Sequence, residues 1–474
     1  MFDTANFVDT FWSDQVLSSL AAYIQIPCQS PAFDAAWDAN GLLDLAFRHL
    51  HDWTSARLRD VVGATVEIVQ IEGRTPVLLA TVPGEGPHVL IYGHADKQPP
   101  MNGWTNDRKP YEPSFEGDRL YGRAGADDGY AVYSAVTAIR AVQAQGVELP
   151  RISILIEGSE ESGSGDLAAY LLYLADEIRS VDIVIALDAG CLDYDGAWLT
   201  TSLRGQVAGT LSVKTLTQAA HSGDLSGIVP SSFRIARQLL SRLEDEVTGR
   251  IRVQEFYAQI PSLLEEHARS AGRALGNKVL AGLPLADGVA AVDPDSATLL
   301  LNRAWRPQLT VTGFEGLPAV AQASAAMHPE TRLKLSLRLP PSCEAELAGE
   351  TLKKLLEKDP PNHAEVTFEL EMVSQGWHSN PLSASLTASL EAAARKSFGT
   401  GLAFFGGGGG IPFLKMVEDA FPDSQVIVTG VLGPGANAHG PDEFLHVPTA
   451  KRLTSMLAFF LADLGSNKTM RGVL

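Results

Sequence analysis

Residues 89–96 read VLIYGHAD, and this stretch decides the fold. Its four leading apolar residues predict a buried strand that ends at Gly93. His94 and Asp96 follow, and they point the same way because side chains alternate along an extended chain. The imidazole can then bind a metal ion while the neighbouring carboxylate fixes its tautomer. The alternative is an ordinary His and Asp at a strand end, which this stretch alone does not exclude.

Length and composition indicate a globular protein with more than one domain. The chain has 474 residues, which is too many for a single hydrophobic core. A hydrophobic content of 45% with 20% charged residues is ordinary for a globular protein in water. The net charge of -19 argues against nucleic acid and against anionic membrane surfaces as partners. No apolar run approaches the ~20 residues that a membrane helix requires.

The cysteines and the N-terminus bear on the compartment. Cys28, Cys191 and Cys343 are few and widely spaced, which suggests a reducing compartment and excludes a zinc site built from cysteines. The first residues are acidic, whereas a signal peptide begins with basic ones. We therefore expect a cytoplasmic protein.

Helices and strands alternate along the first two hundred residues. Hydrophobic periodicity predicts helices over 6–25, 42–58, 130–144 and 166–178, and strands over 65–71, 77–82, 88–93, 152–156 and 183–187. This alternation is typical of an α/β fold, with a mostly parallel sheet and helices on both faces. Ligands of such folds gather at the carboxyl ends of the strands.

The pattern changes between about 203 and 373. Strands over 207–213, 332–340 and 364–373 alternate between apolar and polar residues, helices are predicted over 232–243 and 344–357, and 248–330 looks irregular. Open alternation indicates a smaller α+β domain with one solvated sheet face. The first pattern then resumes, with helices over 384–397 and from about 448 and a strand over 426–429. We expect a catalytic domain made of 1–202 and 374–474, interrupted by 203–373.

Acidic residues and histidines recur where predicted strands end or tight turns begin. They are His94, Asp127, the pair Glu160 and Glu161, Asp188, and His439. Two imidazoles with three or four carboxylates are the ligand set of a dinuclear zinc or manganese site, in which one carboxylate is shared. Of two adjacent glutamates, one can bind metal while the other acts as general base. A solvated charged turn would also explain that pair alone, but the agreement of five segments favours a metal site.

Three motifs resemble the M20 family of di-zinc metallopeptidases. They are GHAD at 93–96, YGRAGADD at 121–128 and EGSEESGS at 157–164. The spacings from His94 to Asp127 and from Asp127 to Glu161 resemble those of the carnosinase-type dipeptidases. The resemblance covers essentially the whole chain, and it implies an inserted lid and dimerisation domain at about 203–373. It also implies a homodimer that cleaves the amide bond of dipeptides or similar small peptides by metal-activated water.

The resemblance assigns roles to the candidate site residues. One metal would be held by His94, Asp127 and Asp188, and the other by Asp127, Glu161 and His439. Glu160 would be the general base, Asp96 would orient His94, and the peptide bond between Asp127 and Asp128 would be cis. The two divalent ions would be zinc, with manganese or cobalt as alternatives. Aspartate at 188 resembles dipeptidase and aminopeptidase members, whereas deacylating and carboxypeptidase members typically carry glutamate there.

Two segments of the inserted domain also resemble the family. AHSG at 220–223 is similar to the segment whose histidine polarises the scissile carbonyl from the partner subunit, a role implied for His221. SLRLP at 336–340 is similar to the segment whose arginine grips the substrate carboxylate, and Arg338 would use its planar fork for this. A simple turn at His221 and an ordinary strand arginine at Arg338 are the alternatives.

Two departures from the family pattern concern the substrate. Residues 127–130 read DDGY, where the family usually has Asp-Asp-Lys-Gly, and 406–412 read GGGGGIP, where dipeptidases usually have Arg-Glu-Gly-Gly-Ser-Ile-Pro. The N–H groups of Gly409 and Gly410 can still cradle an anion, but the charged side chains are absent from this loop. An N-acyl amino acid deacylase of the same fold is therefore an alternative. A binding protein that has lost the chemistry is a second one, although no ligand or base is missing.

Overall fold

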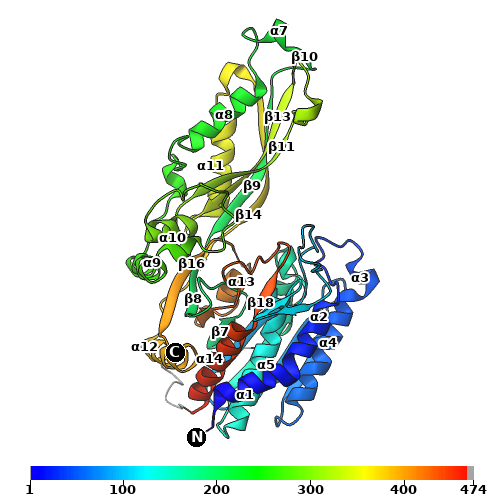
Figure 1. Cartoon of the computed structure of the whole chain (residues 1–474), viewed down its shortest axis with the longest axis vertical. Coiled ribbons are helices and arrows are strands. Elements are labelled where there is room, and N and C mark those ends of the chain that lie inside the picture. The colour runs from blue at the N-terminus through cyan, green and yellow to red at the C-terminus, as the bar shows by residue number, and fades with distance from the viewer. Residues whose placement is uncertain (1, 179, 411, 467–474) are drawn as a thin grey trace.

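The computed structural model describes residues 2–178, 180–410 and 412–466. A large domain carries both ends of the chain, and a smaller elongated part extends from it (Figure 1). Among the described helices, none combines the length and the apolar character needed to cross a bilayer.

A six-stranded sheet forms the centre of the large domain, in the order β1-β2-β6-β3-β7-β17. Its strands are β1 Thr65–Val69, β2 Val77–Val82, β3 His88–His94, β6 Arg151–Glu157, β7 Ile183–Ala186 and β17 Gln425–Val428. β3 pairs in parallel with both β6 and β7, and β7 pairs in parallel with β17. β2 runs antiparallel to both of its neighbours, β1 and β6, and is thus the one strand of this sheet that runs opposite to the other five. The mostly parallel sheet that the sequence predicts is therefore confirmed.

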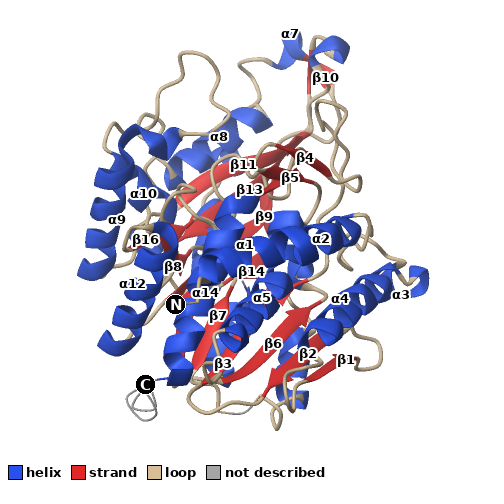
Figure 2. Cartoon of the chain, turned by 60° about the horizontal axis from the view of Figure 1, so that its bottom comes forward, coloured by secondary structure: helices blue, strands red, loops and turns tan. Residues whose placement is uncertain are grey.

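Helices cover both faces of this sheet, which is why every residue of β3 is buried. Val89 and Ile91 contact the core beneath α1 Thr4–Phe11, α2 Leu17–Ile24, α4 Leu42–Leu58, α5 Tyr130–Ala144, α12 Ala384–Phe398 and α14 Val447–Ser466. Leu90 and Tyr92 face the opposite core, with α6 Leu167–Tyr173 and α13 Pro412–Ala420. Figure 2 shows α1, α5 and α14 lying across one face of the sheet. The apolar run at 89–92 is the signature of a strand buried on two sides.

The smaller part, here called the small domain, is built on a four-stranded antiparallel sheet in the order β11-β13-β9-β14. The strands are β9 Gly205–Lys214, β11 Gln308–Glu315, β13 Glu330–Leu339 and β14 Glu365–Ser374. α8 Ser232–Leu243 and α11 Ala345–Glu357 pack on one face of the sheet, against residues such as Leu211 and Leu335. Thr367 and Glu369 on β14 are exposed, whereas Phe368 between them is buried. This is the predicted α+β sheet with one solvated face.

The expectation of an irregular stretch over 248–330 is wrong in part. The structure has two helices there, α9 Ser262–Leu275 and α10 Ser296–Ala304, followed by β11. The buried side of α9 includes Ala268 and Ala271 between Leu264 and Leu275. Alanine is a weak hydrophobic signal, so the helical periodicity of this segment is hard to see in the sequence.

Helices α9 and α10 pack on two strands that the sequence analysis also missed. These are β8 Ala197–Leu203 and β16 Leu402–Gly407, which pair in parallel. Their shared core includes Trp198 and Phe405 from the strands and Leu264 and Leu300 from the helices. α10 therefore lies beside the glycine run at 406–410. The domain boundaries at 203 and 373 stay a prediction.

The parallel strands bring their carboxyl ends to one edge of the sheet. His94 ends β3, Asp188 follows β7, and Glu160 follows β6 after a short turn. Gly93 lies next to this edge, and the backbone of β3 approaches α5 closely at that point. A Cβ atom added to Gly93 would lie 2.5 Å from Asp128 Oδ2 and 2.6 Å from the Cβ of Ala131.

We predict that Gly93→Ala destabilises the large domain by about 1–3 kcal/mol, because the new methyl group overpacks the junction of β3 and α5. The measurement is the urea-unfolding midpoint, which should fall. Gly165→Ala is the matched control, because a Cβ atom there would meet nothing within 4 Å. Equal midpoints for the two variants would contradict this account of the junction.

Candidate metal centre

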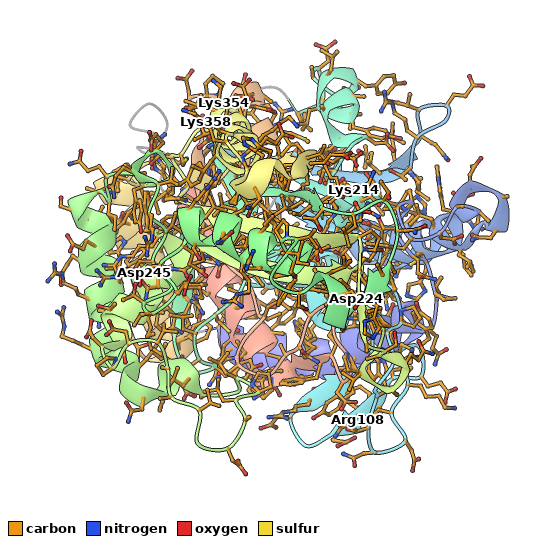
Figure 3. All side chains as sticks on the ribbon, turned by 90° about the horizontal axis from the view of Figure 1, so that it is seen from above. Arg108, Lys214, Asp224, Asp245, Lys354 and Lys358 are labelled. Carbon is orange, nitrogen blue, oxygen red and sulfur yellow. The ribbon has the colours of Figure 1, made fainter. Side chains whose placement is uncertain are left out.

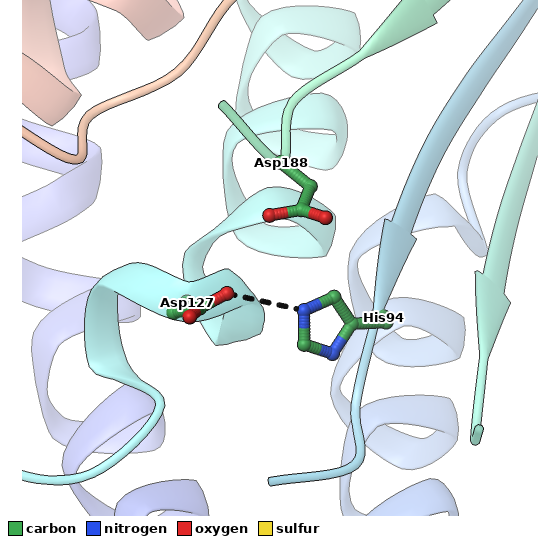
Figure 4. Close-up of side chains that lie close together, drawn as sticks. All are labelled: His94, Asp127 and Asp188. Atoms are coloured by element: carbon green, nitrogen blue, oxygen red, sulfur yellow. Dashed lines mark hydrogen bonds and ion pairs between the residues drawn. The ribbon is translucent and has the colours of Figure 1, made fainter. Parts of the chain in front are cut away.

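Three side chains from three separate segments converge at the carboxyl edge of the sheet. His94 ends β3, Asp188 follows β7, and Asp127 lies in the turn Gly125–Gly129 that precedes α5. One ligand atom from each of the three lies within 4.8 Å of the others. His94 Nε2 is 3.3 Å from Asp127 Oδ1, and both carboxylates turn toward the imidazole ring (Figure 4).

A second group of three shares Asp127 with the first. It adds Glu161 and His439, and again one ligand atom from each residue lies within 4.8 Å of the others. His439 Nε2 is 3.0 Å from Asp127 Oδ2 and 3.3 Å from Glu161 Oε2. The two oxygens of Asp127 therefore face one imidazole each. This is the position of a carboxylate that is shared between two cations.

The charges in these groups favour added positive charge. Burial opposes ionisation of Asp127, but the imidazoles of His439 and His94 donate hydrogen bonds to it and lower its pKa. Burial raises the pKa of Asp188 to about 6, and burial together with the charge of Asp127 raises the pKa of Glu161 to about 8. A divalent cation would stabilise these carboxylates in their charged form. Imidazole nitrogens with carboxylate oxygens are donors that suit zinc, manganese or cobalt, so the residues present fit a pair of such ions.

Asp96 contacts one residue of each group, His94 of the first and Glu161 of the second. Its carboxylate is fully buried and accepts hydrogen bonds from the backbone N–H groups of Glu160 and Glu161, both at 3.1 Å. The same carboxylate is 3.4 Å from His94 Nδ1, and the backbone carbonyl of Asp96 is 3.1 Å from that nitrogen. Asp96 therefore lies where the sequence analysis expects an orienting group for His94. It also fixes the turn that carries both glutamates, which the sequence analysis did not foresee.

The adjacent glutamates face different surroundings. Glu160 lines a cavity of about 390 Å³, together with Asp127, Asp188, Arg303, the glycines at 407–410 and His439. Burial and the charge of Asp188 raise the pKa of Glu160. Glu161 instead lies against His439, and Gln98 Nε2 donates a hydrogen bond to its Oε2 at 2.6 Å. Gly409 and Gly410 line the same cavity as Glu160. Their contact with a substrate stays a prediction.

A buried ion pair holds the loop of His439, and the sequence analysis missed it. Arg123 Nη1 is 2.6 Å from Glu443 Oε2, and Arg123 Nη2 donates to the carbonyl of Gly440 at 2.8 Å. The short strand β18 Phe444–His446 continues this loop and pairs with β5 Arg119–Tyr121, just before Arg123. The sequence contained one hint of this pair: Arg123 shortly precedes the predicted ligand Asp127, and Glu443 shortly follows the predicted ligand His439. Nothing in a single sequence shows that two such distant charges pair.

The peptide bond between Asp127 and Asp128 is cis, as the resemblance implies. Asp128 is buried, and its Oδ2 accepts a hydrogen bond from the backbone N–H of His94 at 3.3 Å. Asp128 thus contacts the strand end that carries the first imidazole, although the sequence analysis gave it no role.

Besides Asp96, two predicted site residues are in neither ligand group and do not line this cavity. His221 lies in β10 Ala220–His221, followed by α7 Ser222–Leu225, at the end of the molecule opposite both chain termini (Figure 1). Its side chain is 64% exposed, and its Nδ1 is 3.4 Å from Asp224, which is labelled on the upper surface in Figure 3. Arg338 lies on β13 opposite Gln206 and is not among the residues that line the cavity. The roles of both residues stay predictions.

Comparison with known proteins identifies the family. A profile of Peptidase family M20/M25/M40 matches residues 90–463. A cysteinylglycine-S-conjugate dipeptidase of Corynebacterium striatum is 27% identical over 419 residues, which cover 87% of this chain and 89% of that protein. A Beta-Ala-His dipeptidase of Mus musculus is 28% identical over 292 residues, or 60% of this chain and 58% of that one.

The solved structure of human carnosine dipeptidase 1 has the same fold. It superposes with a TM-score of 0.78 at 22% identity, and the match covers 98% of both chains. The motifs around His94, Asp127 and Glu161 had indicated the same family, and the match extends over most of the sequence. The chain therefore belongs to peptidase family M20/M25/M40 and is a metallopeptidase.

Proposed function

We propose that this protein is a dinuclear metal-dependent dipeptidase that hydrolyses the amide bond of unblocked dipeptides. The observation that carries the proposal is the position of Asp127, whose two oxygens face His94 and His439 while Glu160 lines the adjoining cavity. The similarity to proteins named as dipeptidases supports the substrate class.

Two sets of three residues would hold the two cations. His94, Asp127 and Asp188 would hold one ion, and Asp127, Glu161 and His439 would hold the other. Zinc suits this donor set best, and manganese and cobalt suit it as well. The bound ions would supply Lewis acidity, which polarises an amide carbonyl and lowers the pKa of water.

The protein residues move the protons. Glu160 accepts a proton from the attacking water, whose oxygen bonds to the amide carbon. The carbon–nitrogen bond then breaks, and Glu160 returns the proton to the departing amine. Asp96 keeps Glu160 in place, because its carboxylate accepts the backbone N–H of that residue. Proton transfer requires that the base lie within hydrogen-bond distance of the water, and a fixed backbone at Glu160 helps to keep its carboxylate at that distance.

The first prediction concerns metal dependence and substrate. The metal-loaded protein should hydrolyse unblocked dipeptides faster than N-acetyl or N-succinyl amino acids that share the C-terminal residue. Chelation should abolish this activity, and Zn²⁺, Mn²⁺ or Co²⁺ should restore it. Turnover is followed by amine release, and metal content by elemental analysis. Hydrolysis by a protein shown to be free of metal would contradict the mechanism, and faster cleavage of the acylated compounds would favour the deacylase alternative.

The second prediction separates base from ligand. Glu160→Gln should retain both metals and lose at least ~10²-fold in kcat, the scale of a general base. Asp127→Asn should weaken the binding of both metals, because it alters the shared ligand. Glu67→Gln makes the same chemical change at an exposed position of β1 and serves as the control. If Glu160→Gln lost metal while Asp127→Asn retained it, the two roles would be assigned wrongly.

The third prediction concerns His221, which we propose acts in the site of a partner subunit within a homodimer. Its exposure at the tip of the small domain supports a role outside its own chain. There its N–H would stabilise the negative charge that develops on the carbonyl oxygen, and loss of one such donor typically costs ~10²- to 10³-fold in kcat. Glu160→Gln and His221→Ala should each be nearly inactive alone.

Mixed subunits test this assignment. In a mixed dimer the His221→Ala subunit keeps an intact metal centre and receives His221 from its partner. Random exchange in an equal mixture should therefore restore about a quarter of wild-type activity, because half of the dimers are mixed and each has one working site. A mixture of Glu160→Gln with Asp127→Asn is the control, since each of those subunits has a defect in its own centre. Mixed dimers that are visible by native mass spectrometry but inactive would exclude action across the interface.

A further inference from the structure

Arg303 is a partly buried cation at the cavity beside the candidate metal ligands, and neither the family motifs nor the predicted roles include it. It lies in the last turn of α10 and lines the same cavity as Asp127, Glu160 and His439. Its Nε and Nη2 atoms are buried and have no hydrogen-bond partner in the part of the chain that the structure describes. The guanidinium carbon lies 5.8 Å from the centre of the Phe405 ring, but this contact supplies no hydrogen-bond acceptor. Buried donor atoms without acceptors destabilise a protein, so an anion bound in the adjoining cavity would stabilise this side chain.

The glycine run lets α10 approach the cavity. A Cβ atom on Gly408 would lie 3.3 Å from Arg303 Cγ and 3.3 Å from Arg204 Nη2. On Gly406 it would lie 2.4 Å from the Cβ of Ala304, the residue that follows Arg303. A side chain at Gly406 would therefore push α10 away, and one at Gly408 would crowd the Arg303 and Arg204 side chains. The glycine run has no charged side chains of its own. Because glycines have no side chains, α10 can lie close to the run, and its residue Arg303 reaches the same cavity.

Arg204 supports this arrangement. Its Nε donates to the carbonyl of Gly408 at 3.3 Å, and its Nη1 donates to the carbonyl of Asn302 at 3.5 Å. It thus links the glycine run to the residue that precedes Arg303. Burial, together with the charges of Arg338 and Arg303, lowers the pKa of Arg204 to about 10. The guanidinium of Arg204 is therefore close enough to those of Arg338 and Arg303 to be repelled by each of them.

The cavity is consequently lined by both signs of charge. Asp127, Glu160 and Asp188 supply carboxylates, and Arg303 supplies a guanidinium with two free donor atoms. A free dipeptide carries an ammonium group at one end and a carboxylate at the other, so its charges complement those of the wall. An arginine fork can bind both oxygens of a carboxylate at once.

We propose that Arg303 binds the carboxylate of the substrate, alongside Arg338, for which the resemblance implies the same role, and thereby selects dipeptides with a free C-terminus. Arg204 would be a positioning residue that holds the glycine run against α10. This role rests on the proposed function, because it assumes that the substrate is a dipeptide and assigns its C-terminal carboxylate to Arg303.

The test compares a dipeptide with its C-terminal amide. Arg303→Met should lower kcat/KM for the free acid roughly 10²-fold, mainly through KM, because a charge-assisted bond to the ground state is lost. The amide should change by less than about threefold, since it has no carboxylate to lose. Arg269→Met is the matched control, because Arg269 lies exposed on α9 and pairs with Glu265. An equal loss on acid and amide, or no loss on either, would overturn the inference.

A stability measurement and a second variant show whether the loss of activity in Arg303→Met comes from misfolding. Arg303→Met removes two buried donor atoms that have no acceptor among the described residues and puts an apolar side chain in their place, so the melting temperature should not fall. Arg303→Lys keeps the charge without the fork, and its kcat/KM for the free acid should lie between those of the wild type and Arg303→Met. If Arg303→Met folds poorly, Arg303→Lys alone decides: unchanged kcat/KM for the free acid would overturn the inference.

A ligand that cannot be hydrolysed separates this inference from the proposed function. We would measure calorimetrically the binding of a reduced dipeptide, in which a methylene group replaces the amide carbonyl. Its affinity should fall roughly 10²-fold in Arg303→Met. Such a fall in a protein that hydrolyses no dipeptide would support Arg303 and overturn the dipeptidase function. Hydrolysis with unchanged affinity in the variant would overturn the role of Arg303 alone.

Discussion

The metal centre depends on one buried carboxylate that binds no metal in our assignment. Asp96 has no exposed surface, and its two oxygens accept the backbone N–H groups of Glu160 and Glu161 while one of them lies beside the imidazole of His94. A buried carboxylate is stable only when such partners surround it. The end of β3 and the turn after β6 are therefore fixed relative to each other by a single side chain. The sheet sets the distance between these strands, and Asp96 sets the orientation of the groups that they carry.

The same principle extends outward from the centre. The loop of His439 is far from β3 in sequence, and it is held by the buried pair of Arg123 and Glu443 and by the pairing of β18 with β5. Each of these contacts involves a residue within a few positions of a candidate ligand. Because interactions of buried ions are strong only when both partners are in place, the geometry of the second cluster depends on this pair as well as on its own ligands.

The sequence sufficed wherever the signal was local. The apolar run before His94, the alternation along β13 and the motifs around Asp127 and Glu161 were enough to predict the parallel sheet, the small domain and the family. Helix α9 was missed because alanines weaken its apolar stripe, and α10 was missed with it as part of the stretch 248–330. Arg303 could not be identified as a cavity residue, because only the packing of α10 on β16 brings it there. The pairing of Arg123 with Glu443 was equally invisible, since it depends on the completed fold.

The position of His439 in the sequence determines when the candidate ligands can come together during synthesis of the chain. His439 is the last of the candidate ligands along the chain, and its position depends on Glu443 and on the strand that follows. Synthesis proceeds from the N-terminus, and domains tend to fold as their residues emerge. A nascent chain that already contains His94, Asp127, Glu161 and Asp188 still lacks the second imidazole. The complete set of candidate donors therefore forms only after residues 439–446 have been synthesised, and a nascent chain that stops before them lacks part of the proposed site.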